Sequence, residues 1–169
     1  MALGSNLGDR EGNLRRAIMA IGARTRLVAA SSVYETEPMY REDQGWFLNC
    51  VVVVETDLDP HALLRWLKET EAELGRDPRA ARNAPRVIDM DILFYGEVVI
   101  SGPSLQLPHP GIAERAFVLV PLEEVRPSLV HPVLGKSVAE LLDGLQTRKG
   151  VVRRPDVLSG LLPLPPRQP

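Results

Sequence analysis

The segment 46–56 (WFLNCVVVVET) is the most strand-like part of the chain, and it requires a fold that contains a sheet. Its β-branched and aromatic residues favour extended backbone. The run 27–36 (LVAASSVYET) is also rich in β-branched and small residues and has no helical period. We therefore expect two strands, with a loop at about 37–45 between them.

Two helices are predicted around these strands from capping residues and apolar spacing. Asp9 is a good N-cap for a helix at about 10–23, in which apolar residues recur every three or four positions. Asp59, followed by a proline, begins a second helix at about 60–74 that carries a stripe of leucines. Each helix follows or precedes a predicted strand, so helices and strands belong to one core.

The predicted order of helix, strand, strand, helix, strand is that of a ferredoxin-like α+β core (βαββαβ) that lacks its first strand. A strand at 87–95 (VIDMDILFY) closes this order, and 97–100 could pair with it across a glycine turn. Only Met, Ala and Leu precede the loop signal at 4–9, so the first strand is expected to be truncated to two or three residues. Additional C-terminal elements follow and end in a helix near 137–145.

Chain length and the proline-rich end predict one domain with a tail. At the usual ~100–200 residues per domain, the 169 residues allow one domain, which we place at 1–150. The tail 151–169 holds five of the 15 prolines and is expected to be an extension that favours polyproline II. We expect the protein to be a monomer.

Composition limits what the protein binds and where it acts. The formal net charge of −2 excludes the broad basic surface of a nucleic-acid-binding protein. No stretch approaches the ~18–20 apolar residues of a membrane span, and the first residues lack the features of a signal peptide. The single cysteine, Cys50, excludes an intrachain disulfide. We expect a cytoplasmic protein that binds small molecules, with no nucleic acid and no membrane as partner.

Asp89 and Asp91 are the first candidates for chemistry. Side chains alternate along a strand, so both carboxylates point to one face while Met90 and its apolar neighbours, Phe94 among them, point into a core. Two like charges about 7 Å apart, at ~3.3 Å of rise per residue, repel each other unless a cation or an arginine neutralises them. Oxygen ligands of this kind suit Mg²⁺ that is completed by water and phosphate. The alternative is a solvated strand face.

An arginine-rich loop at 75–86 leads directly into this strand. Its four arginines could clamp a polyphosphate through bidentate contacts. They are Arg76, Arg79, Arg82 and Arg86. The alternative is a solvated, mobile cationic loop. Glu71 interrupts the leucine stripe of the preceding helix, where it is either an exposed edge residue or a carboxylate that reaches into a site.

Seven different short motifs are spread along most of the chain. They are LGSNLGDR at 3–10, SSVYETEP at 31–38, FLNCVV at 47–52, LGR at 74–76, PRVIDMDILFYG at 85–96, LPHP at 107–110 and ERAFVLVPL at 114–122. Each is weak by itself, but the last three in this order are highly specific. In order and spacing, over about 3–145, the chain resembles the 6-hydroxymethyl-7,8-dihydropterin pyrophosphokinase family.

The resemblance implies an ATP-dependent diphosphotransferase of folate biosynthesis. It would transfer the pyrophosphoryl group of ATP to the hydroxymethyl oxygen of the dihydropterin and release AMP. Two Mg²⁺ ions are implied, with Asp89 and Asp91 as their ligands, since such ions can bridge phosphates and neutralise the charge that develops in line. ATP would be the co-substrate.

The resemblance and the arginine loop together assign residues to roles. The expected catalytic residues are Arg76, Arg86, Asp89 and Asp91. The expected ATP site is Glu71, Arg76, Arg79, Arg82, Arg86, Ile92, His109 and Arg115. The expected pterin site is Thr36, Pro38, Met39, Phe47, Asn49 and Phe117. In that site the two phenylalanines would sandwich the flat ring and Asn49 would bond its edge.

Alternatives to this enzyme remain at this point. Asn83 and Ala84 stand where the family often has Trp and Gly, which affects closure of the arginine loop and ATP affinity. A catalytically impaired ferredoxin-like paralogue that binds pterin or nucleotide without turnover would keep the fold, but it need not keep the aspartate pair. A metal-dependent sugar or nucleotidyl transferase also uses an Asp-x-Asp pair, but the chain has no glycine-rich Rossmann turn.

Overall fold

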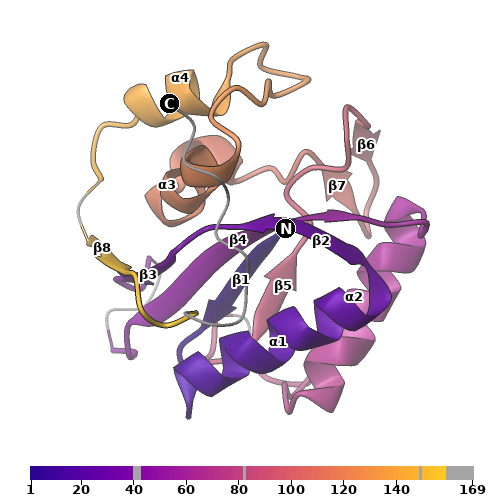
Figure 1. Ribbon diagram of the computed structural model, residues 1–169, viewed down its shortest axis with the longest axis vertical. Coiled ribbons are helices and arrows are strands. Elements are labelled where there is room, and N and C mark those ends of the chain that lie inside the picture. The colour runs from indigo at the N-terminus through magenta and orange to yellow at the C-terminus, as the bar shows by residue number, and fades with distance from the viewer. Residues whose placement is uncertain (40–42, 82, 149, 159–169) are drawn as a thin grey trace.

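The computed structural model describes residues 1–39, 43–81, 83–148 and 150–158 (Figure 1). Within these ranges the chain folds into an antiparallel sheet with helices packed on both of its faces, so it is an α+β protein as predicted. No helix in the same ranges has both the length and the apolar character that crossing a membrane requires.

The main sheet has six strands, and all of its pairings are antiparallel. The strands are β1 (Ala2–Ser5), β2 (Arg26–Ala30), β3 (Val33–Thr36), β4 (Phe47–Glu55), β5 (Asp89–Asp91) and β8 (Val151–Arg154). Their order is β5-β1-β4-β3-β8. β3 pairs with the first half of β4, and β2 pairs with its second half. The predicted strand 27–36 is therefore divided at Ser31, whose backbone N–H and hydroxyl both bond Val51.

β1 lies inside the sheet, between β4 and β5. Its register places Gly4 opposite Asn49 on one side and opposite Asp89 on the other. The expectation of a first strand with two or three residues is wrong, because Gly4 and Ser5 continue the pairing and give β1 four residues. Glycine is a weak strand signal in a sequence, and pairing with two neighbouring strands overrides it.

The first two helices confirm the prediction from caps and spacing. α1 (Arg10–Arg24) and α2 (Pro60–Glu73) each begin after an aspartate whose carboxylate accepts hydrogen bonds from N–H groups of the first turn. Both helices bury apolar side chains in the larger core cluster, together with residues of β1, β4 and the β5 region. They therefore cover one face of the sheet (Figure 1).

The opposite face is covered by α3 (Ala116–Val125) and α4 (Val138–Asp143) (Figure 1). α4 confirms the predicted last helix and begins with a capping box between Ser137 and Glu140. The sequence did not predict α3 as a helix. α3 packs between β4 and α4 and is apolar around most of its circumference, so no amphipathic period marks it. A 3₁₀ turn, η1 (Ile112–Glu114), leads into it.

Of the predicted strand 87–95, only the three residues of β5 form a strand. The expected partner at 97–100 does not pair with it. Instead, β6 (Ile100–Ser101) pairs with β7 (Gln106–Leu107) in a separate two-stranded sheet. Met90 points into the larger core as predicted, and so do the apolar residues two positions before and after it. The expectation for Phe94 is wrong, because the chain has left the strand there and Phe94 packs on the opposite face of the sheet.

Residues 151–158 belong to the fold, so the tail expected from residue 151 is corrected. β8 pairs along β3, and Val157 and Leu158 are buried in the larger core. The proline content of the end of the chain misled the prediction, because Pro155 is the one proline between 151 and 158. The rest of the predicted tail, 159–169, lies outside the described residues.

Candidate active site

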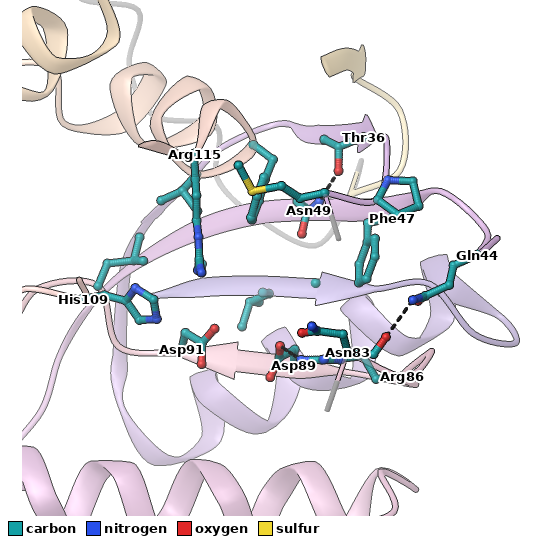
Figure 2. Close-up of a pocket in the computed structure, with 18 of the residues that line it drawn as sticks. Thr36, Gln44, Phe47, Asn49, Asn83, Arg86, Asp89, Asp91, His109 and Arg115 are labelled. Atoms are coloured by element: carbon teal, nitrogen blue, oxygen red, sulfur yellow. Dashed lines mark hydrogen bonds and ion pairs between the residues drawn. The ribbon is translucent and has the colours of Figure 1, made fainter. Parts of the chain in front are cut away.

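A cavity of about 310 Å³ lies where β5, β1 and β4 run side by side (Figure 2). The start of α3 and the loops that follow β3 and precede β5 complete its walls. Its lining residues with functional groups are Thr36, Glu37, Gln44, Phe47, Asn49, Lys68, Arg76, Asn83, Arg86, Asp89, Asp91, His109, Arg115 and Phe117. Apart from Glu37, which directly follows β3, carboxylates and cations gather near β5, whereas amide, hydroxyl and aromatic groups gather near β4. We call these the charged half and the aromatic half.

Asp89 and Asp91 reach the charged half from the same side of β5, as strand alternation predicts, and Met90 between them is buried on the other side. One carboxylate oxygen of Asp89 accepts a hydrogen bond from Arg76 and the other accepts one from Arg86. Burial alone would raise the pKa of Asp89, but the two guanidinium groups outweigh it and hold the pKa below its ordinary value. Asp89 is therefore ionised at neutral pH.

Asp91 has a different environment from its neighbour. The Lys68 ammonium lies 3.8 Å from its Oδ1, and its side chain is 39% exposed against 21% for Asp89. Burial of the carboxylate raises the pKa of Asp91, and the adjacent Asp89 charge raises it further. A positive charge bound between the two carboxylates would remove both penalties.

The donor set of the charged half fits a hard divalent cation such as Mg²⁺. Such an ion prefers oxygen ligands and commonly takes one or two protein carboxylates, with water and substrate phosphates in its other positions. Within the described residues, no cluster of three or more His, Cys, Asp and Glu side chains is arranged to hold a metal. Asp89 and Asp91 would therefore hold the ion together with oxygens from outside the protein.

Glu71 lies behind the charged half and does not line the cavity. Its side chain is 2% exposed and accepts hydrogen bonds from Lys68, from Arg76 and, at 2.6 Å, from the Met90 N–H. Burial raises the pKa of Glu71, although its cationic partners oppose this. The carboxylate thus ties α2 to β5 and orients Arg76 toward Asp89, which explains why an acidic residue interrupts the leucine stripe.

Lys68 is a lining residue that the sequence reasoning missed. Its ammonium donates hydrogen bonds to Glu71 Oε1 at 2.8 Å and to the Met90 carbonyl at 3.3 Å. Residues three positions apart share one helix face. The position of Lys68 three residues before Glu71 is therefore the signal that could have pointed to it.

His109 and Arg115 border the charged half on the side of α3 (Figure 2). His109 Nδ1 accepts a hydrogen bond from the Gly111 N–H at 3.2 Å, which assigns the proton of the neutral ring to Nε2. Burial lowers the pKa of His109 in spite of the opposing charge of Asp91, so the neutral ring is favoured. A Cβ at Gly111 would lie 2.6 Å from the Arg115 guanidinium, so the glycine leaves room for that side chain.

The aromatic half contains all the residues predicted for the pterin site. Thr36, Pro38, Met39, Phe47, Asn49 and Phe117 line the cavity together. Asn49 Nδ2 donates a hydrogen bond to Thr36 Oγ1 at 2.6 Å, and both side chains are buried (Figure 2). This hydrogen bond fixes the plane of the Asn49 amide. The Asn49 Oδ1 atom then faces Gly4 and can accept a further hydrogen bond. The arrangement can recognise a flat ligand with a hydrogen-bonding edge.

Asn6 links the loops on the two sides of the cavity. Its Nδ2 donates to Gln44 Oε1 at 3.0 Å, and its Oδ1 accepts from the Arg86 N–H at 2.8 Å. Gln44 in turn donates to the Asn83 carbonyl at 2.6 Å (Figure 2). Asn83 has a φ of 60°, a conformation that asparagine tolerates better than most residues. The sequence reasoning missed Gln44 in this role because its partner is a backbone carbonyl.

Four residues predicted for the ATP site do not appear among the described residues of the cavity wall, the first being Glu71, which lies behind it. Ile92 is buried in the larger core. Arg79 is exposed in the arginine loop, where its backbone N–H bonds Asp77. Arg82 lies outside the described residues.

The fold and the cavity define an α+β protein that can bind a phosphorylated ligand and a flat polar ring side by side. A family model described as 7,8-dihydro-6-hydroxymethylpterin-pyrophosphokinase matches residues 1–127. The chain belongs to this family, which confirms the resemblance found in its motifs.

Known proteins of the family match over most of the chain. The chain is 46% identical over 144 residues to the 2-amino-4-hydroxy-6-hydroxymethyldihydropteridine pyrophosphokinase of Methylorubrum extorquens. The match covers 84% of this chain and 89% of that protein. The Bacillus subtilis protein of the same name is 45% identical over 127 residues, 74% of this chain and 75% of its own length. A folic acid synthesis protein of Dictyostelium discoideum is 41% identical over 79% of this chain, which spans 20% of that protein.

A solved structure supports the fold. The crystal structure of Plasmodium falciparum HPPK-DHPS, wild type with pteroate, superimposes with a TM-score of 0.69 at 19% sequence identity. The match covers 84% of this chain and 41% of that one. The chain thus spans less than half of this larger protein, and about a fifth of the Dictyostelium relative.

Proposed function

We propose that the protein transfers pyrophosphate from ATP to the hydroxymethyl group of 6-hydroxymethyl-7,8-dihydropterin, giving the pterin diphosphate and AMP for folate biosynthesis. One observation carries this proposal: a single cavity holds Asp89 and Asp91 at one side and Asn49 with two phenylalanines at the other. A phosphate donor and a flat acceptor bound in these halves would meet above Gly4. The names of the bacterial relatives support the same reaction.

The charged half would take the triphosphate of ATP. Arg76 and Arg86 pair with Asp89 in the structure, and phosphate oxygens would compete for the same guanidinium donors because they match them in geometry. Asp89 and Asp91 would hold two Mg²⁺ ions in this proposal, and the ions would supply positive charge that neutralises the charge developing on the phosphates. His109 and Arg115 would contact the nucleotide on the α3 side.

The transfer joins the hydroxymethyl oxygen to the β-phosphorus of ATP and breaks the bond from that phosphorus to the oxygen shared with the α-phosphate. The leaving oxygen departs with AMP, and the hydroxyl proton is released. The residues of this chain act by holding donor and acceptor in line and by balancing their charge. In phosphoryl transfer, positioning and electrostatic stabilisation supply most of the catalysis.

Phe117→Ala is expected to weaken pterin binding by about 1–3 kcal/mol, the usual contribution of an aromatic side chain stacked on a base-like ring. The affinity for ATP should change much less, because Phe117 lies in the aromatic half. Calorimetric titration with each ligand measures both values. Unchanged pterin affinity combined with a lower melting temperature would instead assign Phe117 to the core.

Gly4→Ala is expected to weaken pterin binding while β1 keeps its pairing. A Cβ on Gly4 would lie 2.7 Å from Asn49 Oδ1, closer than such atoms approach, so the amide must move or rotate and its hydrogen bond to Thr36 is disturbed. Losing one net hydrogen bond costs about 0.5–1.5 kcal/mol, which corresponds to a rise in the pterin dissociation constant of roughly two- to tenfold. The fluorescence of bound pterin measures this constant. Unchanged affinity would show that Asn49 does not hold the ring.

The direct test of the proposed function is AMP formation from ATP, Mg²⁺ and 6-hydroxymethyl-7,8-dihydropterin by the purified protein. AMP and the pterin diphosphate should appear in equal amounts, and neither should form without the pterin. A protein that binds both ligands without forming AMP would be the catalytically impaired paralogue.

The strand order also supports a finer proposal for the fold. With β2 and β3 taken as one edge of β4, the elements run strand, helix, strand, strand, helix, strand, and the order β5-β1-β4-β3 is the one that a ferredoxin-like core uses. We include this core in the proposal, with the C-terminal helices and β8 as additions to it.

A further inference from the structure

The ammonium group of Lys68 lies among three carboxylates at the border of the charged half. It is 2.8 Å from Glu71 Oε1, 3.8 Å from Asp91 Oδ1 and 4.0 Å from Asp89 Oδ1. It also donates to the Met90 carbonyl at 3.3 Å. One cation from α2 is thus shared by oxygens of its own helix and of β5.

The surroundings of this ammonium are those that a divalent cation selects. Every partner is a carboxylate or carbonyl oxygen, and hard divalent ions take these same ligands. The two carboxylates proposed to hold Mg²⁺ are also the two that Lys68 approaches. A bound ion and the ammonium would therefore repel each other at short range.

The charges balance without a metal within the cluster of three carboxylates and the cations that contact them. Glu71, Asp89 and Asp91 supply three negative charges, and their cationic partners Lys68, Arg76 and Arg86 supply three positive ones. A divalent ion that arrives alone would leave an excess of positive charge, whereas an ion that arrives with a triphosphate would not. The Lys68 side chain is 44% exposed, so its ammonium can leave the carboxylates and turn toward the cavity.

We propose that Lys68 is a positioning residue that acts as an exchangeable counter-cation, holding Asp89 and Asp91 in the metal-free site and moving to the phosphates when metal and nucleotide bind together. This inference rests on the proposed function. It makes the site select metal-nucleotide complexes over free metal. Arg76 and Arg86 are hydrogen-bonded directly to Asp89, whereas the Lys68 ammonium lies 4.0 Å from Asp89 and 3.8 Å from Asp91, so it is the cation that leaves the two aspartates most easily.

Removal of the Lys68 charge should change two affinities in opposite directions. Lys68→Met keeps the length of the side chain but removes the ammonium, so free divalent cations should bind more tightly. Metal-free ATP should bind more weakly, because the site loses one positive charge. A merely structural role for Lys68 would weaken both, since it would disturb the whole charged half.

The test measures binding of Mn²⁺ alone by electron paramagnetic resonance, and binding of ATP in the presence of EDTA by calorimetry. For Lys68→Met we expect the Mn²⁺ dissociation constant to fall by about two- to fivefold, the size of effect that partly exposed charge pairs produce. The ATP dissociation constant should rise by a similar factor. Lys136→Met, which removes an exposed lysine from the loop before α4, is the matched control and should change neither. An Mn²⁺ affinity that stays the same or falls would overturn the proposal.

Two further variants keep the result interpretable. Asp91→Asn in the Lys68→Met background should abolish the tighter Mn²⁺ binding; tight binding that persists would place the ion elsewhere and overturn the proposal. Lys68→Gln should repeat the effect of Lys68→Met, and it replaces that variant if the methionine form does not fold. Failure of the proposed function would be recognised by a different result, namely that the wild-type protein forms no AMP.

Discussion

Replacing Asp91 by alanine is expected to lower the rate of AMP formation by at least about 10²–10³-fold, and the same holds for Asp89→Ala. The two carboxylates are the only pair that β5 directs into the charged half, and metal held there would neutralise charge on the phosphates. Pterin binding should persist, because Asn49 and the phenylalanines lie in the other half of the cavity. Steady-state AMP formation and pterin titration measure the two effects.

A matched control for this pair is Asp143→Ala. Asp143 lies at the end of α4 with its side chain 80% exposed, far along the chain from the cavity residues, so its removal should leave turnover unchanged. Both active-site variants should also keep the wild-type fold, as seen by circular dichroism. Near-wild-type AMP formation by Asp89→Ala or Asp91→Ala at saturating Mg²⁺ would remove this pair from the proposed mechanism.

Glu71→Leu is expected to lower the free energy of unfolding by about 2–3 kcal/mol. The variant leaves the buried Met90 N–H without its acceptor, and each such group costs about 1–3 kcal/mol. It also removes a partner from Lys68 and Arg76, but these side chains are 44% and 25% exposed, so water compensates much of that loss. At about 2–4 °C per kcal/mol for this chain length, the melting temperature should fall by roughly 4–12 °C.

Chemical denaturation followed by circular dichroism measures this loss, with Glu69→Leu as its control. Glu69 is exposed on the same helix, so its replacement should change stability by no more than about 0.5 kcal/mol. Glu71→Gln should lie between the two, because the amide oxygen can still accept the Met90 N–H. Equal stability of Glu71→Leu and Glu69→Leu would show that Glu71 does not tie α2 to β5.

Features that depend on one residue and its immediate neighbours, such as helix starts and strand faces, could be predicted from the sequence. The aspartates before α1 and α2 mark both helix starts, since a cap needs one side chain and its own backbone. The alternation around Met90 assigns the two aspartates to one face, since a strand has a fixed period of two. The phenylalanines and Asn49 were found through a family resemblance, because nothing local distinguishes them from core residues.

Long-range contacts explain what the sequence did not predict. α3 lies between a strand and a helix, so it lacks the amphipathic stripe that identifies surface helices. β8 pairs with β3, more than a hundred residues away, and no local pattern encodes that partner. Lys68 reaches the site because α2 packs beside β5, and Glu71 holds both elements together. In each case the packing of distant elements creates the feature.

The row formed by Asn49, Gly4 and Asp89 across β4, β1 and β5 would limit which acceptors the proposed reaction can use. Neighbouring strands lie about 4.8 Å apart, so the residues at the ends of this row are separated by two such spacings, roughly 10 Å. Backbone hydrogen bonds maintain that separation, and movement of the surrounding loops leaves it unchanged. If the protein has the function proposed here, a compound with the same ring but an arm one carbon longer would carry its hydroxyl past the phosphorus. The proposed reaction thus implies selection by arm length through the strand spacing, independently of how the ring is recognised.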